Sequence, residues 1–356
     1  MNNVTLKLID ERWAWLSSWF SKINKNETIC VLVGGAIRDW FLEQKVNEID
    51  FLVLKNKIEG NIPTSLLQFA PFLKGPYVLK GTKDIRLHFI NPEVGNTIDI
   101  LPLRAPSLRE DLMLRDFTVN TLIGLLTSDG TIEITDVLGT GFKDLNNKVL
   151  RTPLHPLDTL KDDPVRMLRA LRFSVLMGFK LHHGLMKEII LTSRNKLLLN
   201  VSIERVRQEF EKILCNKALN VGQLARVFYL WGLEENFLPQ SRHIPTISTD
   251  YSRSLSAKFH LLPLDSLERI AAFFLIIIEL NEGLRLLEWG EKINILGNML
   301  FYFGFSKKKT RALIRLIKQL PLTLKSSLIG FDSLNTSIPK RYEHGMEAWK
   351  SFYQVI

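Results

Sequence analysis

The chain has 356 residues, 46% of them hydrophobic and 24% charged, a balance that excludes a disordered chain and is typical of a folded protein with more than one domain. Its formal net charge of +10 favours a polyanionic partner, with nucleic acid as the first choice. The two cysteines, Cys30 and Cys215, are too few for a disulfide framework or a CxxC metal site and are typical of the reducing cytoplasm.

Short apolar runs separated by turns extend from about residue 28 to 135 and predict the strands of one sheet. The runs are ICVLV, IDFLVL, IRLHFI, TIDIL, TLIGLL and TIEITDV, at 29–33, 49–54, 85–90, 97–101, 121–126 and 131–137. Helical patterns lie between some of them. The first part of the chain is therefore expected to be a mixed α/β domain.

Helical patterns alone follow after about residue 150, as at 162–179, 203–215 and 307–320, and they predict an all-α second half. A segment richer in Pro, Ser and His, 239–263, is expected to be a linker. The longest apolar run, 270–278, is too short to span a bilayer, and the N-terminal residues have no apolar signal core. We therefore expect a buried helix at 270–278 and no membrane partner.

A glycine turn follows the first of these predicted strands. In VLVGGAIRDWFL, residues 31–42, a strand ends at Gly34 and Gly35 and a helix begins at once. Glycines there let a phosphate approach the backbone at the positive end of the helix dipole. Arg38, one turn further, is a candidate for bidentate phosphate contacts.

An acidic pair follows in NEIDFLV, residues 47–53. Glu48 and Asp50 are two residues apart, so their side chains leave the same face of a strand. Adjacent carboxylates repel each other, and a hard cation such as Mg²⁺ beside a phosphate site would relieve the repulsion. Asp99, on the predicted strand TIDIL, is a third candidate ligand. The combination predicts metal-assisted chemistry on a phosphate ester.

This pattern resembles the head-domain signature of the nucleotidyltransferase superfamily, in the family of bacterial-type (class II) tRNA nucleotidyltransferases and poly(A) polymerases. That signature reads LVGGxVRDxLL followed by DxDF. Glu48 stands where the family has Asp, so the same charge is carried on a side chain longer by one methylene. The resemblance implies that Glu48, Asp50 and Asp99 are catalytic and that Glu48 and Asp50 hold Mg²⁺.

Four further motifs carry the resemblance to about residue 215. EDLMLRDFTVNTL at 110–122 resembles DLxRRDFTINA, with Leu114 in place of the first Arg, and DVLGTGFKDLNNKVLR at 136–151 resembles a hinge-like motif, with Val137 in place of its proline. LKDDPVRMLRALRF at 160–173 resembles EDPxRxLRAxRF, with Asp162 for Glu, and IERVRQEFEKIL at 203–214 resembles ERIxxELxKLL. Beyond Gly34, Gly35 and Arg38, the resemblance implies that nucleotide is bound by Asp111, Arg115, Asp116, Asn120, Asp163, Arg166, Arg169 and Arg172.

Asp163 and Arg166 also carry a chemical argument of their own. They are three residues apart at a helix start and share a face. A carboxylate that accepts beside a guanidinium that donates complements the edge of cytosine or adenine, whereas guanine and uracil present the reverse pattern. An ordinary ion pair is the alternative, and the family's use of this pair as a template for CTP and ATP favours base selection. Arg169 and Arg172 continue the stripe, either toward the triphosphate or into solvent.

The family architecture implies an α+β fold, in which a nucleotidyltransferase head with a mixed sheet precedes an all-α neck, body and tail. The corresponding ranges are 1–140 for the head, 141–220 for the neck and 221–356 for the body and tail. The helical half is expected to bind tRNA. A basic helix at 305–320 is suited to phosphate contacts, although a solvated face explains it almost as well, and its RNA-binding candidates are Lys307, Lys308, Lys309 and Arg311.

The interval between Asp99 and Asp111 is short, at eleven residues, 100–110. Relatives that add the whole CCA end have a longer loop here, whereas relatives that add only two cytidines lack it. The resemblance thus implies addition of CC from CTP, with a separate A-adding enzyme completing the tRNA. Complete CCA addition with ATP, a poly(A) polymerase, and a non-catalytic RNA-binding relative are the alternatives.

Overall fold

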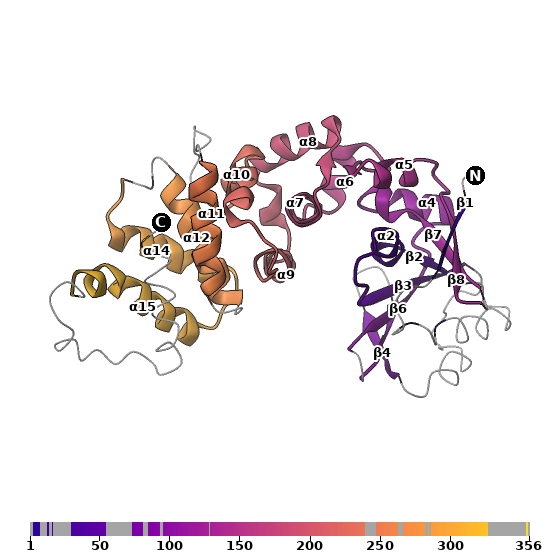
Figure 1. Ribbon diagram of the computed structural model, residues 1–356, viewed down its shortest axis with the longest axis horizontal. Helices are drawn as coiled ribbons and strands as arrows, with labels where there is room; N and C mark the ends of the chain where they lie inside the picture. The colour runs from indigo at the N-terminus through magenta and orange to yellow at the C-terminus, as the bar shows by residue number, and fades with distance from the viewer. Residues whose placement is uncertain are drawn as a thin grey trace. The chain divides into compact units, whose positions relative to one another are not determined.

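A computed structural model of the chain describes residues 3–7, 13, 16, 30–54, 73–80, 85–92, 95–127, 129–238, 247–262, 266–281, 284, 286–326 and 354. The chain forms two compact units, Met1–Thr159 and Leu160–Ile356. The first contains a large sheet and the second is helical (Figure 1), so the α+β fold class is confirmed. The expected division into head, neck, and body with tail stays a prediction. None of the helices that are described is at once long and apolar enough to cross a membrane.

The first unit is built on an eight-stranded sheet with the order β1-β8-β7-β2-β3-β6-β5-β4. Its strands are β1 (Asn3–Lys7), β2 (Cys30–Val33), β3 (Glu48–Val53), β4 (Lys74–Lys80), β5 (Ile85–Ile90), β6 (Thr97–Pro102), β7 (Ile123–Leu126) and β8 (Thr131–Thr135). β3 and β6 pair in parallel, and all other neighbours are antiparallel, so the sheet is mixed as expected.

The six predicted strands are confirmed as β2, β3, β5, β6, β7 and β8. The sequence pattern missed β1 and β4, which form the two edges of the sheet. Edge strands have one neighbour and less burial, so they need no continuous apolar run. In β4 the dipeptide Gly75-Pro76 interrupts the pattern, and the pairing with β5 shifts register between Lys74 and Tyr77.

Short helices position residues around the sheet. They are α2 (Gly35–Phe41), α4 (Leu108–Met113), the 3₁₀ turn η2 (Thr118–Asn120) and α5 (Gly141–Asn146), with β9 (Val149–Leu150) after them and α6 (Pro156–Asp162) at the unit boundary. α2 packs against β2 and β3. A capping box formed by Ser107 and Glu110 fixes the start of α4.

The hinge-like motif forms a tight turn that supports η2. Asp136 accepts hydrogen bonds from the backbone N–H groups of Gly139 and Phe142, and Asp144 of α5 accepts one from the Thr118 hydroxyl at 2.7 Å. A Cβ at Gly141 would lie 3.0 Å from the Thr118 carbonyl oxygen and 2.8 Å from a Leu122 methyl carbon. α5 therefore approaches η2 as closely as only glycine permits.

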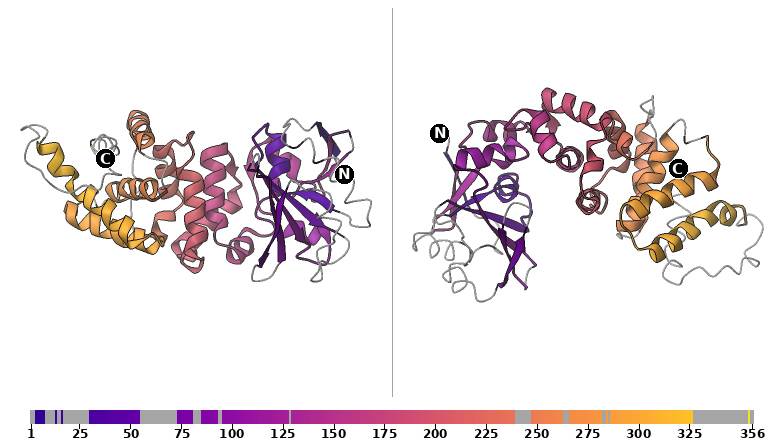
Figure 2. Two further views of the ribbon diagram at one scale, coloured as in Figure 1. Left: turned by 90° about the horizontal axis from the view of Figure 1, so that it is seen from below. Right: turned by 180° about the vertical axis from the view of Figure 1, so that it is seen from behind.

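The second unit is a stack of helices in which each packs on its neighbours (Figure 2). Its elements are α7 (Arg166–Met177), β10 (Lys180–Leu181), α8 (His183–Arg194), η3 (Leu197–Asn200), α9 (Ile203–Leu214), α10 (Val221–Leu230), η4 (Leu233–Asn236), α11 (Thr249–Leu261), α12 (Ser266–Leu280), α14 (Trp289–Tyr302) and α15 (Lys307–Ser326). The run 270–278 is buried throughout within α12, which confirms the expected buried helix.

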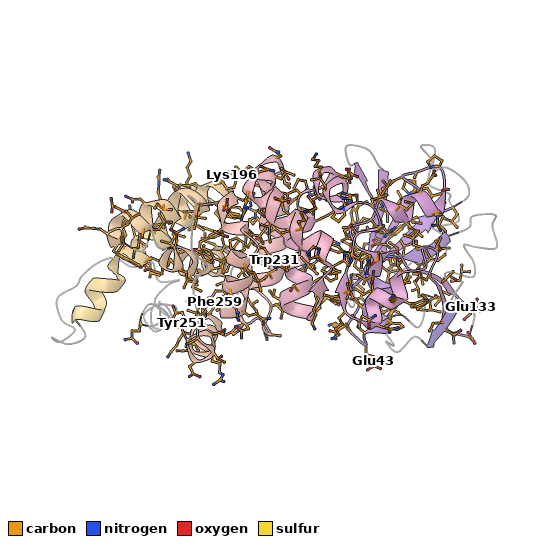
Figure 3. All side chains as sticks on the ribbon, turned by 90° about the horizontal axis from the view of Figure 1, so that it is seen from above. Glu43, Glu133, Lys196, Trp231, Tyr251 and Phe259 are labelled. Carbon is orange, nitrogen blue, oxygen red and sulfur yellow. The ribbon has the colours of Figure 1, made fainter. Side chains whose placement is uncertain are left out.

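A cluster of phenylalanines forms much of the core of this unit. The rings lie 5.3–6.2 Å apart between centroids and belong to Phe210, Phe228, Phe237, Phe273, Phe274 and Phe303. Trp231 is buried within the same unit, whereas Glu133 on β8 points outward from the first unit (Figure 3). Aromatic burial on this scale is a large contribution to stability.

The expected linker at 239–263 is wrong over 249–261, where the structure has α11. Ser248 caps this helix by accepting from the backbone N–H of Tyr251, and Leu255 and Phe259, four residues apart, are both fully buried. The polar composition reflects the exposed face of an amphipathic helix. Residues 239–246 and 263 of the expected linker lie outside the described residues.

Candidate active site

Three carboxylates meet where β3 and β6 run side by side. The parallel register places Asp50 directly opposite Asp99, and Glu48 lies two residues earlier on the same face of β3. One carboxylate oxygen from each lies within 4.8 Å of the other two. Glu48 is exposed, Asp50 is half-buried and Asp99 is completely buried. The structure therefore brings the three predicted catalytic residues together.

This cluster fits a divalent cation by its chemistry. Three negative charges at such separations repel one another, most strongly where burial lowers the effective dielectric constant. Oxygen ligands are those that Mg²⁺ takes, and it commonly uses one or two carboxylates together with substrate phosphates. The gradation from buried Asp99 to exposed Glu48 leaves one side of the cluster open to a ligand that brings its own oxygens.

The glycine turn lies directly beside these carboxylates. Val33, the last residue of β2, pairs with Asp50, and Gly34 follows with φ 79° and ψ −142°, a conformation that side chains strongly disfavour. A Cβ at Gly34 would lie 3.1 Å from Asp50 Oδ2 and 3.4 Å from a terminal nitrogen of Arg115. Glycine is thus required both by the turn and by the close approach of two charged groups.

A chain of hydrogen bonds connects the turn to η2. The Arg38 guanidinium donates to Asn120 Oδ1 at 2.5 Å and, through Nε, to Asp39 Oδ1 at 2.8 Å. The Asn120 amide in turn donates to Asp116 Oδ1 at 2.8 Å, which also accepts from the backbone N–H of Phe117. The structure brings Arg38, Asp116 and Asn120 into one buried network, and their contact with nucleotide stays a prediction.

A second network surrounds the buried carboxylate of Asp111. Its Oδ1 accepts from both the backbone N–H and Nε of Arg104 at 3.1 Å, and its Oδ2 lies 3.6 Å from Arg115 Nη2. Burial lowers the pKa of Arg115 from its ordinary value, while the charge of Asp111 acts to raise it. Asp111 thus holds Arg115 beside Gly34, where a guanidinium can meet an incoming phosphate.

Two residues of these arrangements were missed by sequence reasoning. His88 on β5 lies opposite Asp99, and its Nδ1 is 2.6 Å from Asp99 Oδ1. Because an ionised carboxylate only accepts, Nδ1 carries the hydrogen in this bond. Arg104 closes the turn between β6 and α4. A histidine inside an apolar strand was the available signal for His88, but the strand register decides its partner.

The predicted base-selecting residues lie in the second unit, each with an ionic partner. Asp163 accepts from Arg205 of α9 at 2.7 Å, and Arg166 lies 3.2 Å from Asp162. Arg205 and Asp162 are 51% and 58% exposed at their side chains, whereas Asp163 and Arg166 are 21% and 10% exposed, so one partner of each pair is open to water. Asp163 and Arg166 therefore remain at the start of α7 with partners that a polar ligand can displace.

Arg169 and Arg172 converge on one buried acid. Glu209 of α9 is 5% exposed, and its carboxylate oxygens lie 3.7 Å from Arg169 Nη1 and 3.0 Å from Arg172 Nε. This arrangement joins α7 to α9. Both arginines therefore face Glu209 and not only solvent. Their contact with a triphosphate stays a prediction.

The basic helix expected at 305–320 is α15, which begins at Lys307. The four RNA-binding candidates, Lys307, Lys308, Lys309 and Arg311, are all exposed. Thr310, Leu313 and Ile317 are buried, so the helix has one packed face and one cationic face. The cationic face is the arrangement that phosphate binding needs, and binding itself stays a prediction.

Comparison with known proteins finds tRNA nucleotidyltransferases that are similar to parts of this chain. The family of the poly A polymerase head domain matches residues 79–151. The CC-adding tRNA nucleotidyltransferase of Shouchella clausii is 33% identical over 183 residues, covering 51% of this chain and 43% of its own. The CCA-adding enzyme of Limosilactobacillus fermentum is 29% identical, covering 58% and 50%. The chain spans about half the length of the curated relatives it matches.

Solved structures share the fold over nearly the whole chain. The Thermotoga maritima CCA-adding enzyme complexed with tRNA superposes with a TM-score of 0.68 at 21% identity, covering 99% of this chain and 83% of that one. A CCA-adding enzyme complexed with ATP gives 0.70 at 19% identity over the same shares. These findings make the chain similar to class II tRNA nucleotidyltransferases and poly(A) polymerases of the nucleotidyltransferase superfamily, and the solved structures show that it shares their fold.

Proposed function

We propose that the protein is a tRNA nucleotidyltransferase that adds cytidines to the 3′ end of tRNA from CTP, with release of pyrophosphate. The observation that carries the proposal is the meeting of Glu48, Asp50 and Asp99 beside the Gly34 turn. Relatives that match the chain are named as CC-adding and CCA-adding enzymes, which supports tRNA as the substrate.

The reaction joins the 3′ oxygen of the RNA to the α-phosphorus of CTP. The bond between that phosphorus and the β-phosphate oxygen breaks, pyrophosphate leaves, and the hydroxyl proton is released. Mg²⁺ bound by Glu48 and Asp50, with Asp99 as a further ligand, would supply activation of the hydroxyl and neutralisation of the leaving group. The chain itself contributes a backbone turn at Gly34 and Gly35 that admits the triphosphate closely.

Cationic and polar side chains orient the nucleotide in this proposal. Arg115, held by Asp111, lies next to the turn and pairs with phosphate oxygens. The network of Arg38, Asn120 and Asp116 is rigid because its members bond one another, and it presents polar atoms at a fixed place for the sugar and triphosphate. Such preorganised groups need little rearrangement when the charge on the leaving pyrophosphate develops.

Base selection falls to Asp163 and Arg166. The Asp163 carboxylate accepts from the exocyclic amine of cytosine, and the Arg166 guanidinium donates to the neighbouring ring nitrogen. Binding of the base exchanges the Asp163–Arg205 pair, in which the Arg205 side chain is half-exposed and free to move aside into water. Uracil presents the opposite pattern and would leave both groups without a matched partner, at about 1–3 kcal/mol for each unsatisfied group.

The proposed product is a tRNA that has gained two cytidines and no terminal adenosine. The connection from β6 to α4 contains only residues 103–107. Arg104 bonds to Asp111 within it, and Ser107 caps α4. This five-residue connection is shorter than the loop of the enzymes that add all three nucleotides. Its shortness supports a product with two added cytidines. A separate A-adding enzyme would then complete the tRNA.

One experiment separates the open alternatives. Purified protein is incubated with tRNA lacking its 3′ CCA, Mg²⁺ and each labelled nucleotide in turn, and then with CTP and ATP together. Two cytidines and no adenosine are expected. Addition of a terminal adenosine would indicate a CCA-adding enzyme. A long adenosine tract made from ATP alone would indicate a poly(A) polymerase.

The control is Asp50→Ala, which removes a proposed metal ligand and should abolish transfer while tRNA binding persists. Glu48→Asp tests the family departure and should preserve or raise the rate. Binding of tRNA without any transfer by the unaltered protein would favour a non-catalytic RNA-binding relative.

A further inference from the structure

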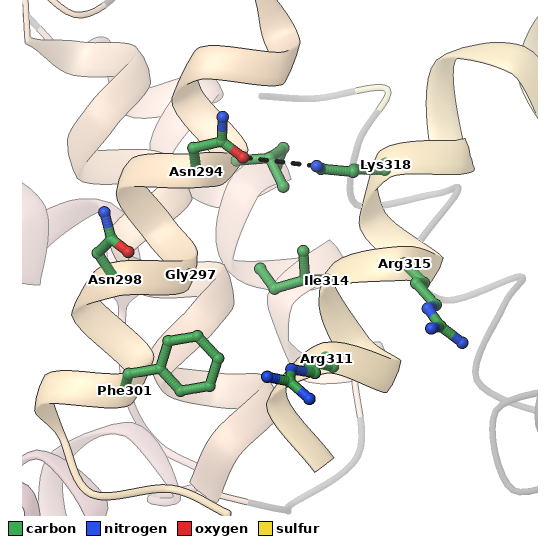
Figure 4. Close-up of a pocket in the computed structure, with 9 residues that line it drawn as sticks. Asn294, Gly297, Asn298, Phe301, Arg311, Ile314, Arg315 and Lys318 are labelled. Atoms are coloured by element: carbon green, nitrogen blue, oxygen red, sulfur yellow. Dashed lines mark hydrogen bonds between the residues drawn. The ribbon is translucent and has the colours of Figure 1, made fainter. Parts of the chain in front are cut away.

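A groove of about 460 Å³ lies between α14 and α15 in the second unit (Figure 4). This volume is within the range of about 300–1,000 Å³ that small-ligand sites occupy. Its floor is apolar, from Ile293 and Ile314, and Gly297 leaves the middle of the groove unfilled. Of the residues that line the groove, only Arg311 is among the RNA-binding candidates named above.

The α14 side of the groove combines two amides with an aromatic ring. Asn294, Asn298 and Phe301 are four and three residues apart, so they lie along one face of the helix, and Figure 4 shows them in a row. Both amides are exposed, and the Phe301 ring is 40% exposed. An amide offers both donors and acceptors to a polar edge, and an exposed ring offers a flat apolar face.

The α15 side is cationic. Arg311, Arg315 and Lys318 repeat the same spacing of four and three residues, and all three are exposed. The sequence of α15 contains no Asp or Glu, so these charges are not balanced along their own helix. Lys318 Nζ lies 3.4 Å from Asn294 Oδ1 across the groove. A single nucleotide can therefore contact the cationic row of α15 and the amides of α14 at the same time.

We propose that this groove binds one unstacked nucleotide of the substrate RNA. The base lies on Phe301 with its polar edge at the amides, and the flanking phosphates contact Arg311, Arg315 and Lys318. An aromatic platform beside a cationic row is the general chemistry of single-stranded nucleic-acid binding. The inference rests on the proposed function for the identity of the RNA, and on the groove itself for the mode of binding.

The first test compares two neighbouring exposed aromatics. Phe301→Leu removes the platform, whereas Tyr302→Leu removes a ring that is 43% exposed on the same helix but does not line the groove. The dissociation constant for tRNA lacking its 3′ CCA is measured by fluorescence anisotropy without nucleotide. Phe301→Leu should weaken binding about ten-fold, since stacking of one base on an aromatic ring is commonly worth about 5- to 150-fold. Tyr302→Leu should change it less than about two-fold.

A second variant fills the groove without changing charge. A Cβ at Gly297 would make an ordinary van der Waals contact, 3.8 Å from the nearest Ile314 carbons, and the rest of the side chain in Gly297→Leu is expected to occupy the groove. It should weaken tRNA binding as Phe301→Leu does, with the salt dependence unchanged. Arg315→Gln should instead reduce the slope of log affinity against log salt, because it leaves one phosphate without its cationic partner.

A measurement on the unaltered protein keeps the inference testable if a variant fails to fold. RNA containing photoreactive 4-thiouridine is crosslinked, and the attached peptide is identified by mass spectrometry. Adducts within α14 or α15 are expected. Adducts confined to other parts of the chain would overturn the inference. Unchanged tRNA affinity in both groove variants, once each is shown to be folded, would overturn it as well.

Failure of this inference is distinguishable from failure of the proposed function. A protein that binds tRNA through the groove but transfers no nucleotide contradicts only the proposed function. A protein that adds cytidines while Phe301→Leu and Gly297→Leu retain full tRNA affinity contradicts only the groove.

Discussion

Replacing Gly34 with alanine tests whether the glycine turn holds the carboxylate cluster in place. Gly34 has φ 79° and ψ −142°, and a side chain in such a conformation costs about 1–3 kcal/mol. The new Cβ would also lie 3.1 Å from Asp50 Oδ2, so that carboxylate must move by a few tenths of an ångström. We expect lower stability, together with weaker binding of a divalent cation.

Gly139 provides the matched control. It has the same φ of 79°, but a Cβ there would have no neighbour within 4 Å. Gly139→Ala should therefore also lower the free energy of unfolding, because a side chain is strained at this positive φ, without disturbing the cluster. A loss of Mn²⁺ binding that Gly34→Ala shows and Gly139→Ala does not is assigned to displacement of Asp50, because both variants place a side chain at a positive φ.

The assays are urea unfolding followed by circular dichroism, Mn²⁺ binding by calorimetry, and CTP incorporation into tRNA. Gly34→Ala should weaken Mn²⁺ binding and slow incorporation by about 10- to 100-fold, the range typical when support of a metal ligand is disturbed. Gly139→Ala should retain both. The reasoning is refuted if both variants bind Mn²⁺ and transfer nucleotide equally well.

Three further predictions concern other parts of the chain. His88→Ala should weaken Mn²⁺ binding by about 10- to 100-fold, because His88 orients the Asp99 carboxylate. His88→Asn should keep part of the affinity, and His155→Ala, at an exposed histidine, should keep all of it. Equal Mn²⁺ affinity in the three variants would contradict this role of His88. Burial raises the pKa of Glu234 to about 8 from 4.5. Between these two pH values the folded state keeps a proton that the unfolded state has lost. The free energy of unfolding should therefore fall as the pH rises from about 4.5 to 8, by at most about 1.4 kcal/mol per pH unit. Glu234→Gln should flatten that slope in urea unfolding measured across this range, and an unchanged slope would exclude Glu234 as its source. Neutralising Lys307, Lys308 and Lys309 together should reduce the salt dependence of tRNA affinity by up to about 0.9 in the log–log slope for each phosphate that these lysines neutralise. An unchanged slope in that triple variant would place the start of α15 away from RNA.

The strands of the first unit show where sequence reasoning succeeds and where it stops. β2, β3 and β6 lie in the middle of the sheet and most of their apolar residues are buried, so an apolar run was sufficient to identify them. The edge strands β1 and β4 are stabilised by pairing with a single neighbour, and a pattern of local composition carries little of that information. The helix α11 was missed for a related reason, since only two of its residues, Leu255 and Phe259, are buried.

The sequence by itself determined which residue types carry the chemistry. Glycines after a buried strand, acids two residues apart, and an acid and an arginine three residues apart each have local spacing that the backbone period turns into a shared face. These features identify Gly34, Glu48 and Asp50, and the start of α7, without knowledge of the tertiary structure.

Only the tertiary structure decided which of these residues have partners and which partners those are. Asp50 meets Asp99 through the parallel register of β3 and β6, and His88 meets Asp99 through the antiparallel register of β5 and β6. Arg205 reaches Asp163 because α9 packs against α7. A shift of one residue in any strand register would turn each side chain to the opposite face. Register and helix packing depend on burial summed over the whole unit, and no local stretch of sequence contains that sum.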